Sequence, residues 1–245
     1  MKKNPVEKII YDFIKNSQRN HWWFVGRKKI VDQILHLYYP KRIQEAIDIG
    51  SGYGAMLPLL LQYCKNVDAL EPLLETKPDL IKLGAREVFS ISSFPNHSVK
   101  GQYELVTLFD VLEHIADQEK ALRIIREQML KPGGRIILTV PAYQWLWTSH
   151  DTVNHHYRRY SKKQLLGLLK ANGYKKIKAT YFMTVLFPLA VLQRLLMKWS
   201  RTTEEFRPIN PVINFILKVV FSSEALWICH FPYPFGLSVL AVAEI

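Results

Sequence analysis

Short apolar runs, closed by turns that contain glycine or proline, alternate along the chain with segments of helical periodicity. The strand-like patterns predict strands at 46–49, 67–70, 86–89, 105–109, 135–140, 177–181 and 236–243. The helix-like patterns predict helices at 30–37, 55–63, 117–130 and 161–172. Strands that alternate with helices are typical of an α/β fold, with a mostly parallel sheet sandwiched by helices.

The alternation divides the chain into four parts of one domain. An N-terminal helical cap at 1–45 precedes a core at 46–182, and a hydrophobic helical insertion at 183–235 precedes the final strand at 236–245. Two amphipathic helices are predicted in the insertion. One apolar face comprises Leu189, Leu192, Leu195, Leu196 and Trp199, and the other comprises Ile213, Ile216, Leu217, Val220 and Phe221. Such helices cover a sheet edge, form a lid over an apolar ligand, or lie on an anionic membrane surface.

Charge adds a preference for anionic partners. The 245 residues contain 33 Lys and Arg against 21 Asp and Glu, for a net charge of +12. Nucleic acid, a phospholipid surface and a phosphorylated substrate all fit that balance. Cys64 and Cys229 are the two cysteines, which excludes a disulfide scaffold. We expect no signal peptide and no transmembrane helix, and therefore a cytoplasmic protein, with a peripheral place at the inner face of the membrane as a further option.

The sharpest local motif is DIGSGYG at 48–54, between a predicted strand and a predicted helix. Glycines at this place allow a tight turn and a close approach of the backbone to a ligand. Glu71 lies 21 residues after Gly50, at the end of the next strand, where a carboxylate can accept hydrogen bonds from both ribose hydroxyls. The pattern favours a nucleoside-type ligand over a mere tight turn. When Ala55 is included, the motif also fits the fingerprint of dinucleotide-binding folds, with Ala in the last place.

Several separate motifs resemble those of class I S-adenosylmethionine-dependent methyltransferases. They are the stretch at 46–54 with its acid two residues before the first glycine, FDVLEHI at 109–115 and LKPGGR at 130–135. In addition, HWWFVGR at 21–27 and HYRRYS at 156–161 resemble a bacterial subgroup of these enzymes, methyltransferase types 11 and 23. The resemblance covers roughly 20–182 and the last strand. It implies a Rossmann-like sheet of seven strands with an antiparallel last strand, and S-adenosylmethionine as the cofactor of the core.

The resemblance also assigns roles to individual residues. The cofactor-binding residues that it implies are Arg27, Asp48, Gly50, Gly52, Gly54, Glu71, Ser92 and Asp110. Family members often place an acid after the third strand to bind the adenine amino group, and here Ser92 stands in that region. Asp110 is expected at the methionine portion of the cofactor, and Arg27 at its carboxylate.

Histidines near two predicted strand ends are the candidate catalytic groups. His114 follows the fourth strand and His156 lies in the loop after the fifth, where either is placed to orient or deprotonate an acceptor. Tyr143, Arg158 and Arg159 are the candidate substrate-binding residues, the arginines as ligands of a phosphate. No metal is expected, because His155 and His156 are adjacent and no helical ligand spacing occurs.

The function predicted from sequence is methyl transfer to a small or lipid-linked acceptor, of glycan or polyprenyl type. RNA methylation ranks second. The chain shows no nucleic-acid module and few aromatics among its basic residues, so a nucleic-acid partner is disfavoured. Two further alternatives are a non-catalytic cofactor-binding partner of a membrane biosynthetic complex and a nicotinamide-dependent oxidoreductase.

Overall fold

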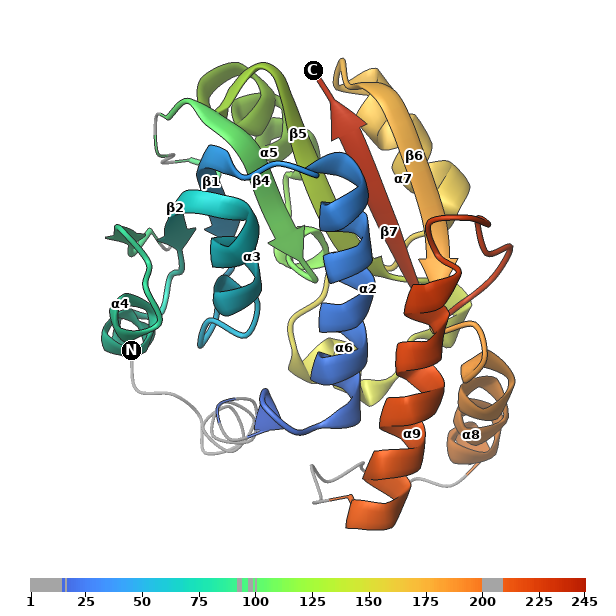
Figure 1. Cartoon of the computed structure of the whole chain (residues 1–245). Coiled ribbons are helices and arrows are strands. Elements are labelled where there is room, and N and C mark those ends of the chain that lie inside the picture. The colour runs from blue at the N-terminus through green and yellow to red at the C-terminus, as the bar shows by residue number, and fades with distance from the viewer. Residues whose placement is uncertain (1–14, 16, 92–93, 97–98, 100, 200–208) are drawn as a thin grey trace.

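The chain folds around one seven-stranded sheet (Figure 1). The structure is a computed structural model and describes residues 15, 17–91, 94–96, 99, 101–199 and 209–245. The strands are β1 (Ile43–Ile49), β2 (Cys64–Leu70), β3 (Val88–Phe89), β4 (Tyr103–Phe109), β5 (Leu130–Pro141), β6 (Lys175–Phe182) and β7 (Ser238–Glu244). They lie in the order β3-β2-β1-β4-β5-β7-β6.

The strand directions confirm the predicted fold class. The neighbouring pairs from β3 to β5 are parallel, whereas β7 runs antiparallel to both of its neighbours, β5 and β6. The sequence order reverses between β1 and β4, which lie side by side at the middle of the sheet. Ligands of such sheets bind at the carboxyl ends of the strands on either side of this switch point.

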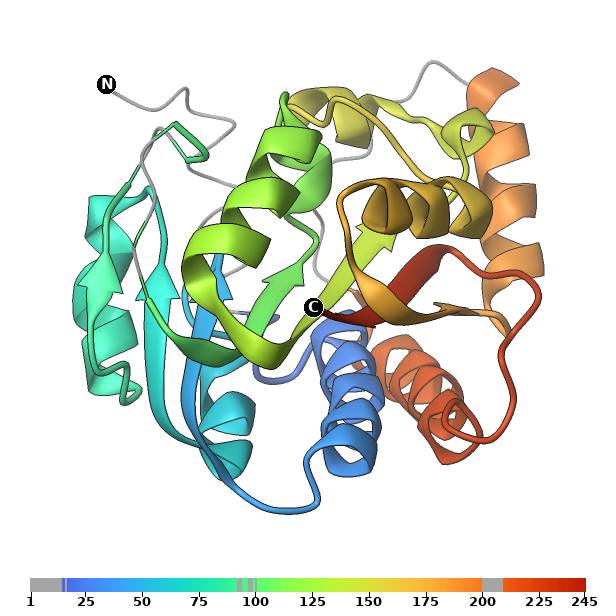
Figure 2. The ribbon, with the colours of Figure 1, turned by 90° about the horizontal axis from the view of Figure 1, so that it is seen from above.

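Helices cover both faces of the sheet and form a three-layered sandwich (Figure 2). The helices are α2 (Trp22–Tyr38), α3 (Leu57–Tyr63), α4 (Lys77–Lys82), α5 (Gln118–Ile124), α6 (Ser149–Val153), α7 (Lys162–Ala171), α8 (Phe187–Trp199) and α9 (Pro211–Ser223). Neighbouring residues of β1 show how the core divides. Ala46 packs in the cluster that contains α2, α3 and Phe221, whereas Ile47 packs with α5 and α7 on the other face. Both faces of the central strands are therefore buried, as is typical of parallel strands covered by helices on either side.

Helix α9 packs along α2, and this contact corrects the predicted apolar face of α9. Asn214 accepts a hydrogen bond from the Trp22 amide (2.9 Å) and donates one to the Asn20 carbonyl (3.0 Å). Ile213 and Ile216 are instead 53% exposed. Leu217, Val220 and Phe221 of the predicted face do pack against the core, so the correction concerns Ile213 and Ile216. The reason is tertiary, because hydrogen bonds to Asn20 and Trp22 turn Asn214 towards α2 and leave those two isoleucines at the surface.

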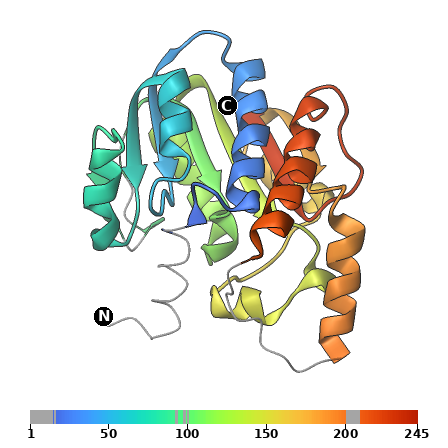
Figure 3. The ribbon, with the colours of Figure 1, turned by 60° about the horizontal axis from the view of Figure 1, so that its bottom comes forward.

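The same correction holds for α8 as far as its side chains are described. Leu189 and Leu192 are exposed, whereas Phe187, Ala190 and Val191 pack against the core. Helices α8 and α9 project beyond the carboxyl edge of the sheet, next to α6 (Figure 3). Among the residues that the structure describes, no helix combines the length and the apolar character needed to cross a membrane.

Candidate functional site

The glycine-rich turn follows β1 at the carboxyl edge of the sheet. Gly50, Gly52 and Gly54 all have left-handed backbone angles, with φ of +72°, +54° and +79°. A Cβ atom at Gly50 would lie 2.3 Å from Val111 Cγ2, so this glycine allows the turn to pack on the loop after β4. At Gly52 a Cβ would meet no atom of the described residues within 4 Å. The backbone at Gly52 is therefore open to a ligand.

Glu71 ties the end of β2 to this turn. Its carboxylate accepts hydrogen bonds from the amides of Gly52 (2.7 Å) and Leu73 (3.1 Å). The side chain is 5% exposed. The spacing of acid and glycines in the sequence thus corresponds to a direct contact at the expected edge of the sheet.

Asp48 supports the turn from below. Its carboxylate accepts a hydrogen bond from Thr107 Oγ1 (2.6 Å), and its backbone carbonyl accepts one from Ser51 Oγ (2.7 Å). Burial raises the pKa of Asp48 to about 6, against the lowering effect of the Thr107 hydrogen bond. A buried group held in this way positions the turn.

Asp110 and Arg27 meet at the end of β4. The two side chains form an ion pair, and the Arg27 guanidinium also lies over the Trp23 ring, 4.0 Å from its centroid. Arg27 Nε is buried and has no hydrogen-bond partner among the described residues. The φ of Asp110 is +57°, a conformation costly for a residue with a Cβ and concentrated at functional sites. Thr139 Oγ1 hydrogen-bonds the same carboxylate at 3.1 Å.

A buried ion pair organises the loop after β5. Arg159 donates to both carboxylate oxygens of Asp151 at 2.8 and 2.9 Å, and to the Ala142 carbonyl at 3.2 Å. His156 Nδ1 lies 2.8 Å from Asp151 Oδ1. Burial alone would raise the pKa of Asp151, but the hydrogen bonds from His156 and Arg159 outweigh it and hold that pKa well below its usual range.

The loops after β4 and β5 bring two histidines into contact. The rings of His114 and His156 meet edge to face, with centroids 4.5 Å apart. Partial desolvation by the surrounding loops, reinforced by the neighbouring His156, lowers the pKa of His114 to about 4, while part of its side chain stays exposed. Beside them, burial and then the negative charge of Asp110 raise the pKa of Glu113 well above its usual range. The Glu113 Oε2 atom has no hydrogen-bond partner among the described residues.

Four further residues were predicted to bind substrate or cofactor: Tyr143, Arg158, Arg159 and Ser92. Tyr143, with φ of +58°, stacks on Tyr181 at 5.2 Å. Arg158 donates to the Ala116 carbonyl (2.8 Å) and is half-buried, whereas Arg159 is buried with its guanidinium engaged by Asp151. Ser92, predicted at the adenine, lies outside the described residues.

Sequence reasoning missed Asp151 and Glu113 as site residues. A signal existed for each of them. Thr148 and Asp151 form a capping box at the start of α6, which marks Asp151 as a fixed side chain. Glu113 stands next to His114 within the FDVLEHI motif.

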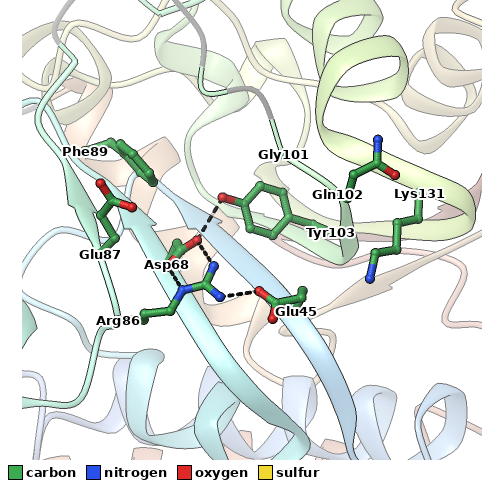
Figure 4. A pocket seen from close by; sticks show the side chains of 9 residues that line it. All are labelled: Glu45, Asp68, Arg86, Glu87, Phe89, Gly101, Gln102, Tyr103 and Lys131. Carbon is green, nitrogen blue, oxygen red and sulfur yellow. Dashed lines mark hydrogen bonds and ion pairs between the residues drawn. The ribbon is translucent and has the colours of Figure 1, made fainter.

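A polar hollow of about 330 Å³ lies at the opposite edge of the sheet (Figure 4). There Asp68 accepts hydrogen bonds from Arg86 Nε (2.8 Å) and from the Tyr103 hydroxyl (2.9 Å), and Arg86 also pairs with Glu45. Glu45 and Tyr103 lie at the amino ends of their strands, far along the sheet from Gly50 and Asp110. We interpret this network as a link between neighbouring strands and not as part of the site.

Comparisons with known proteins agree with the geometry at the carboxyl edge. A family model described as a methyltransferase domain matches residues 23–179. The chain is 27% identical over 135 residues to ubiquinone biosynthesis O-methyltransferase of Escherichia coli O6:H1. That match covers 49% of this chain and 56% of the relative, so the chain spans about half the length of the curated relatives it matches.

Solved structures show the same fold at low identity. An S-adenosylmethionine-dependent methyltransferase from Archaeoglobus fulgidus superposes with a TM-score of 0.55 at 15% identity, over 89% of this chain and 94% of that one. The N-methyltransferase NodS from Bradyrhizobium japonicum, in complex with S-adenosyl-L-homocysteine, has a TM-score of 0.54 at 13% identity, over 73% and 90% of the two chains.

Proposed function

The chain belongs to the class I S-adenosylmethionine-dependent methyltransferase family, and on that premise we propose that it methylates a hydroxyl group of a small, apolar or lipid-linked acceptor. The observation that carries the proposal is the hydrogen bond between Glu71 and the Gly52 amide, which joins an acid to an open glycine turn at the switch point of the sheet. The printed activity of the Escherichia coli relative, an O-methyltransferase, supports a hydroxyl acceptor.

The described residues fit S-adenosylmethionine. Gly52 leaves room for the nucleoside beside its own amide, and Glu71 is placed for the ribose hydroxyls. Arg27 has an unused buried N–H, which suits the methionine carboxylate, and Asp110 suits the methionine ammonium group. Asp48 and Gly50 act on the ligand only through the turn that they hold. Binding would require the Arg27–Asp110 pair to admit the methionine charges.

S-adenosylmethionine supplies a methyl group on a sulfonium, whose carbon–sulfur bond breaks with its electron pair left on sulfur as the methyl–oxygen bond forms. The acceptor hydroxyl loses its proton in the same reaction. His114 follows the end of β4, His156 lies in the loop after β5, and their rings are in contact. In this proposal the two histidines promote the loss of that proton. Orientation of the acceptor is expected to supply most of the acceleration, for which ~7–11 kcal/mol is the known range.

Exposed apolar side chains next to the site support an apolar acceptor. The exposed apolar surface of α9 and the segment after it comprises Val212, Ile213, Phe215, Ile216, Val219, Leu226, Trp227 and Phe231. Residues 152–203 contain no acidic side chain, and the chain carries a net charge of +12. This combination suits an anionic lipid bilayer, from which a lipid-linked acceptor would reach the carboxyl edge of the sheet.

Calorimetric titration with S-adenosyl-L-homocysteine tests the cofactor assignment. We expect binding by the wild-type protein and a loss of at least tenfold in Glu71→Ala. Glu87→Ala is the matched control, because Glu87 is an exposed acid of the opposite edge. Binding that Glu71→Ala leaves unchanged would overturn the assignment.

Co-sedimentation with phosphatidylglycerol vesicles tests the lipid surface. The double variant Phe215→Ser/Val219→Ser is expected to lose binding. Leu74→Ser, which changes an exposed leucine of the segment after β2, on the β3 side of the sheet, is expected to keep it. Equal binding by all three proteins would remove the membrane from the proposal and leave a freely diffusing apolar acceptor.

A further inference from the structure

Glu113, His114 and His156 form a compact group of metal-ligating side chains. Each offers one ligand atom, and these atoms all lie within 4.8 Å of one another. Ligand atoms that share one ion, each ~2.1 Å from it, lie about 3–4 Å apart. Small side-chain rotations are therefore enough to bring the three onto one ion.

The state of Glu113 is a second, independent indication of a ligand. The residue is 1% exposed, and its Oε2 atom has no hydrogen-bond partner within the described part of the chain. A buried carboxylate oxygen without a donor is costly, and such atoms are rare in folded proteins. A bound cation would supply the missing partner.

Both histidines are already held in the manner of metal ligands. His156 Nδ1 is hydrogen-bonded to Asp151, and Arg159 holds Asp151 in place. His114 is hydrogen-bonded to the backbone of Asn154. Metal-binding histidines characteristically use one ring nitrogen for the metal and give the other to a carboxylate or a backbone carbonyl. The second ring nitrogen of each histidine is thus left for the cluster.

We infer that Glu113, His114 and His156 bind a divalent transition-metal ion at the acceptor side of the site. One carboxylate and two imidazoles suit Zn²⁺, Mn²⁺ or Co²⁺, whereas Mg²⁺ prefers oxygen ligands alone. The adjacency of His155 and His156 indicates no such site from sequence. The fold creates the site because it adds Glu113 and His114 from the loop after another strand.

The role of the metal rests on the proposed function. An acceptor hydroxyl that binds the ion would lose its proton to water more readily, and its oxygen would then take the methyl group. In the metal-bound protein His114 and His156 therefore promote the loss of that proton through the ion, and not as bases themselves. Asp151 and Arg159 are positioning residues in this arrangement, because they orient His156 without touching the ion.

Titration of chelator-treated full-length protein tests the inference. Co²⁺ binding is followed by visible absorption and Zn²⁺ binding by calorimetry, and we expect one equivalent of either. Glu113→Gln and His156→Asn are expected to weaken binding at least tenfold. His155→Asn is the matched control, because it changes the adjacent histidine and Asn tolerates its left-handed backbone (φ +57°). Melting curves check that each variant folds. If Glu113→Gln does not fold, the metal affinity of His156→Asn decides the test.

A parallel titration with S-adenosyl-L-homocysteine separates the two claims. If S-adenosyl-L-homocysteine binds but neither metal does, or if the variants bind metal like the wild type, the metal inference is wrong and the proposed function stands. If one equivalent of metal binds but the product does not, the metal site stands and the proposed function is wrong.

Discussion

Arg159 and Asp151 form a buried ion pair in which Nε lies 2.8 Å from Oδ1 and Nη2 lies 2.9 Å from Oδ2. Both side chains belong to the segment between β5 and α7, and Asp151 passes the constraint on to His156. The pair therefore fixes the geometry of the loop after β5, and it engages a basic residue that the sequence assigns to a phosphate.

Loss of this pair is expected to destabilise the fold. Arg159→Met leaves Asp151 buried without its main partner, and we expect a loss of about 3–5 kcal/mol in the free energy of unfolding, measured with urea. Lys15→Met is the comparison, since Lys15 and Asp79 form a solvent-exposed pair, and a change within about 1 kcal/mol is expected there. Equal effects would contradict the assigned role of Arg159.

Gly26 is expected to tolerate no side chain. A Cβ there would lie 2.1 Å from the ring of Phe221, at the contact between α2 and α9. Gly26→Ala should cost about 1–3 kcal/mol by overpacking, and Phe221→Leu in the same chain should recover part of it. Gly167→Ala in α7, where a Cβ meets nothing within 4 Å, should instead gain up to ~1 kcal/mol. Urea unfolding of the four proteins checks this order.

Gly52→Ala separates ligand binding from stability. Within the described part of the chain the methyl group meets no atom within 4 Å, so the expected cost to folding is the ~1–2 kcal/mol of a left-handed alanine. Affinity for S-adenosyl-L-homocysteine should fall at least tenfold, because the methyl group occupies the space opposite Glu71. Gly133→Ala has the same open surroundings and a φ of +76° but lies at the start of β5. An equal loss of affinity in Gly133→Ala would show that strain, and not the ligand space, is responsible.

Asp48 is expected to give a distinctive pH dependence of stability. Its pKa is about 6 in the folded chain and near 3.8 when exposed, so the folded state binds the proton more tightly than the unfolded state. The contribution of Asp48 is therefore most favourable below pH 4 and is lost as the pH rises to 6, by up to ~3 kcal/mol. Asp48→Asn removes this dependence. Urea unfolding of both proteins at pH 4 and pH 7 should show that the stability of Asp48→Asn relative to the wild type increases with pH. A difference in stability that does not change with pH would contradict the assignment.

Much of the fold follows from local patterns in the chain. Each predicted strand overlaps an observed one, and β1 and β5 start earlier than predicted, at Ile43 and Leu130. The existence of the strands is predictable because parallel strands buried on both faces are rich in apolar residues, a pattern that is visible without any partner strand. The inward side was predicted wrongly at Leu189 and Leu192 of α8 and at Ile213 and Ile216 of α9, for the opposite reason. An amphipathic pattern identifies two sides of a helix, and only the contacts of Asn214 with Asn20 and Trp22 decide which side turns inward.

The candidate site divides in the same way. Local sequence was enough to predict the glycine turn, Glu71 and the family, because a ligand turn at a strand end needs particular residues at short spacings that do not depend on distant parts of the chain. Only the tertiary structure decided that Arg27 meets Asp110, that Arg159 serves Asp151, and that Glu113 and His114 face His156. These contacts join loops that follow different strands, and the order of strands in the sheet, which the chain does not express locally, brings them together.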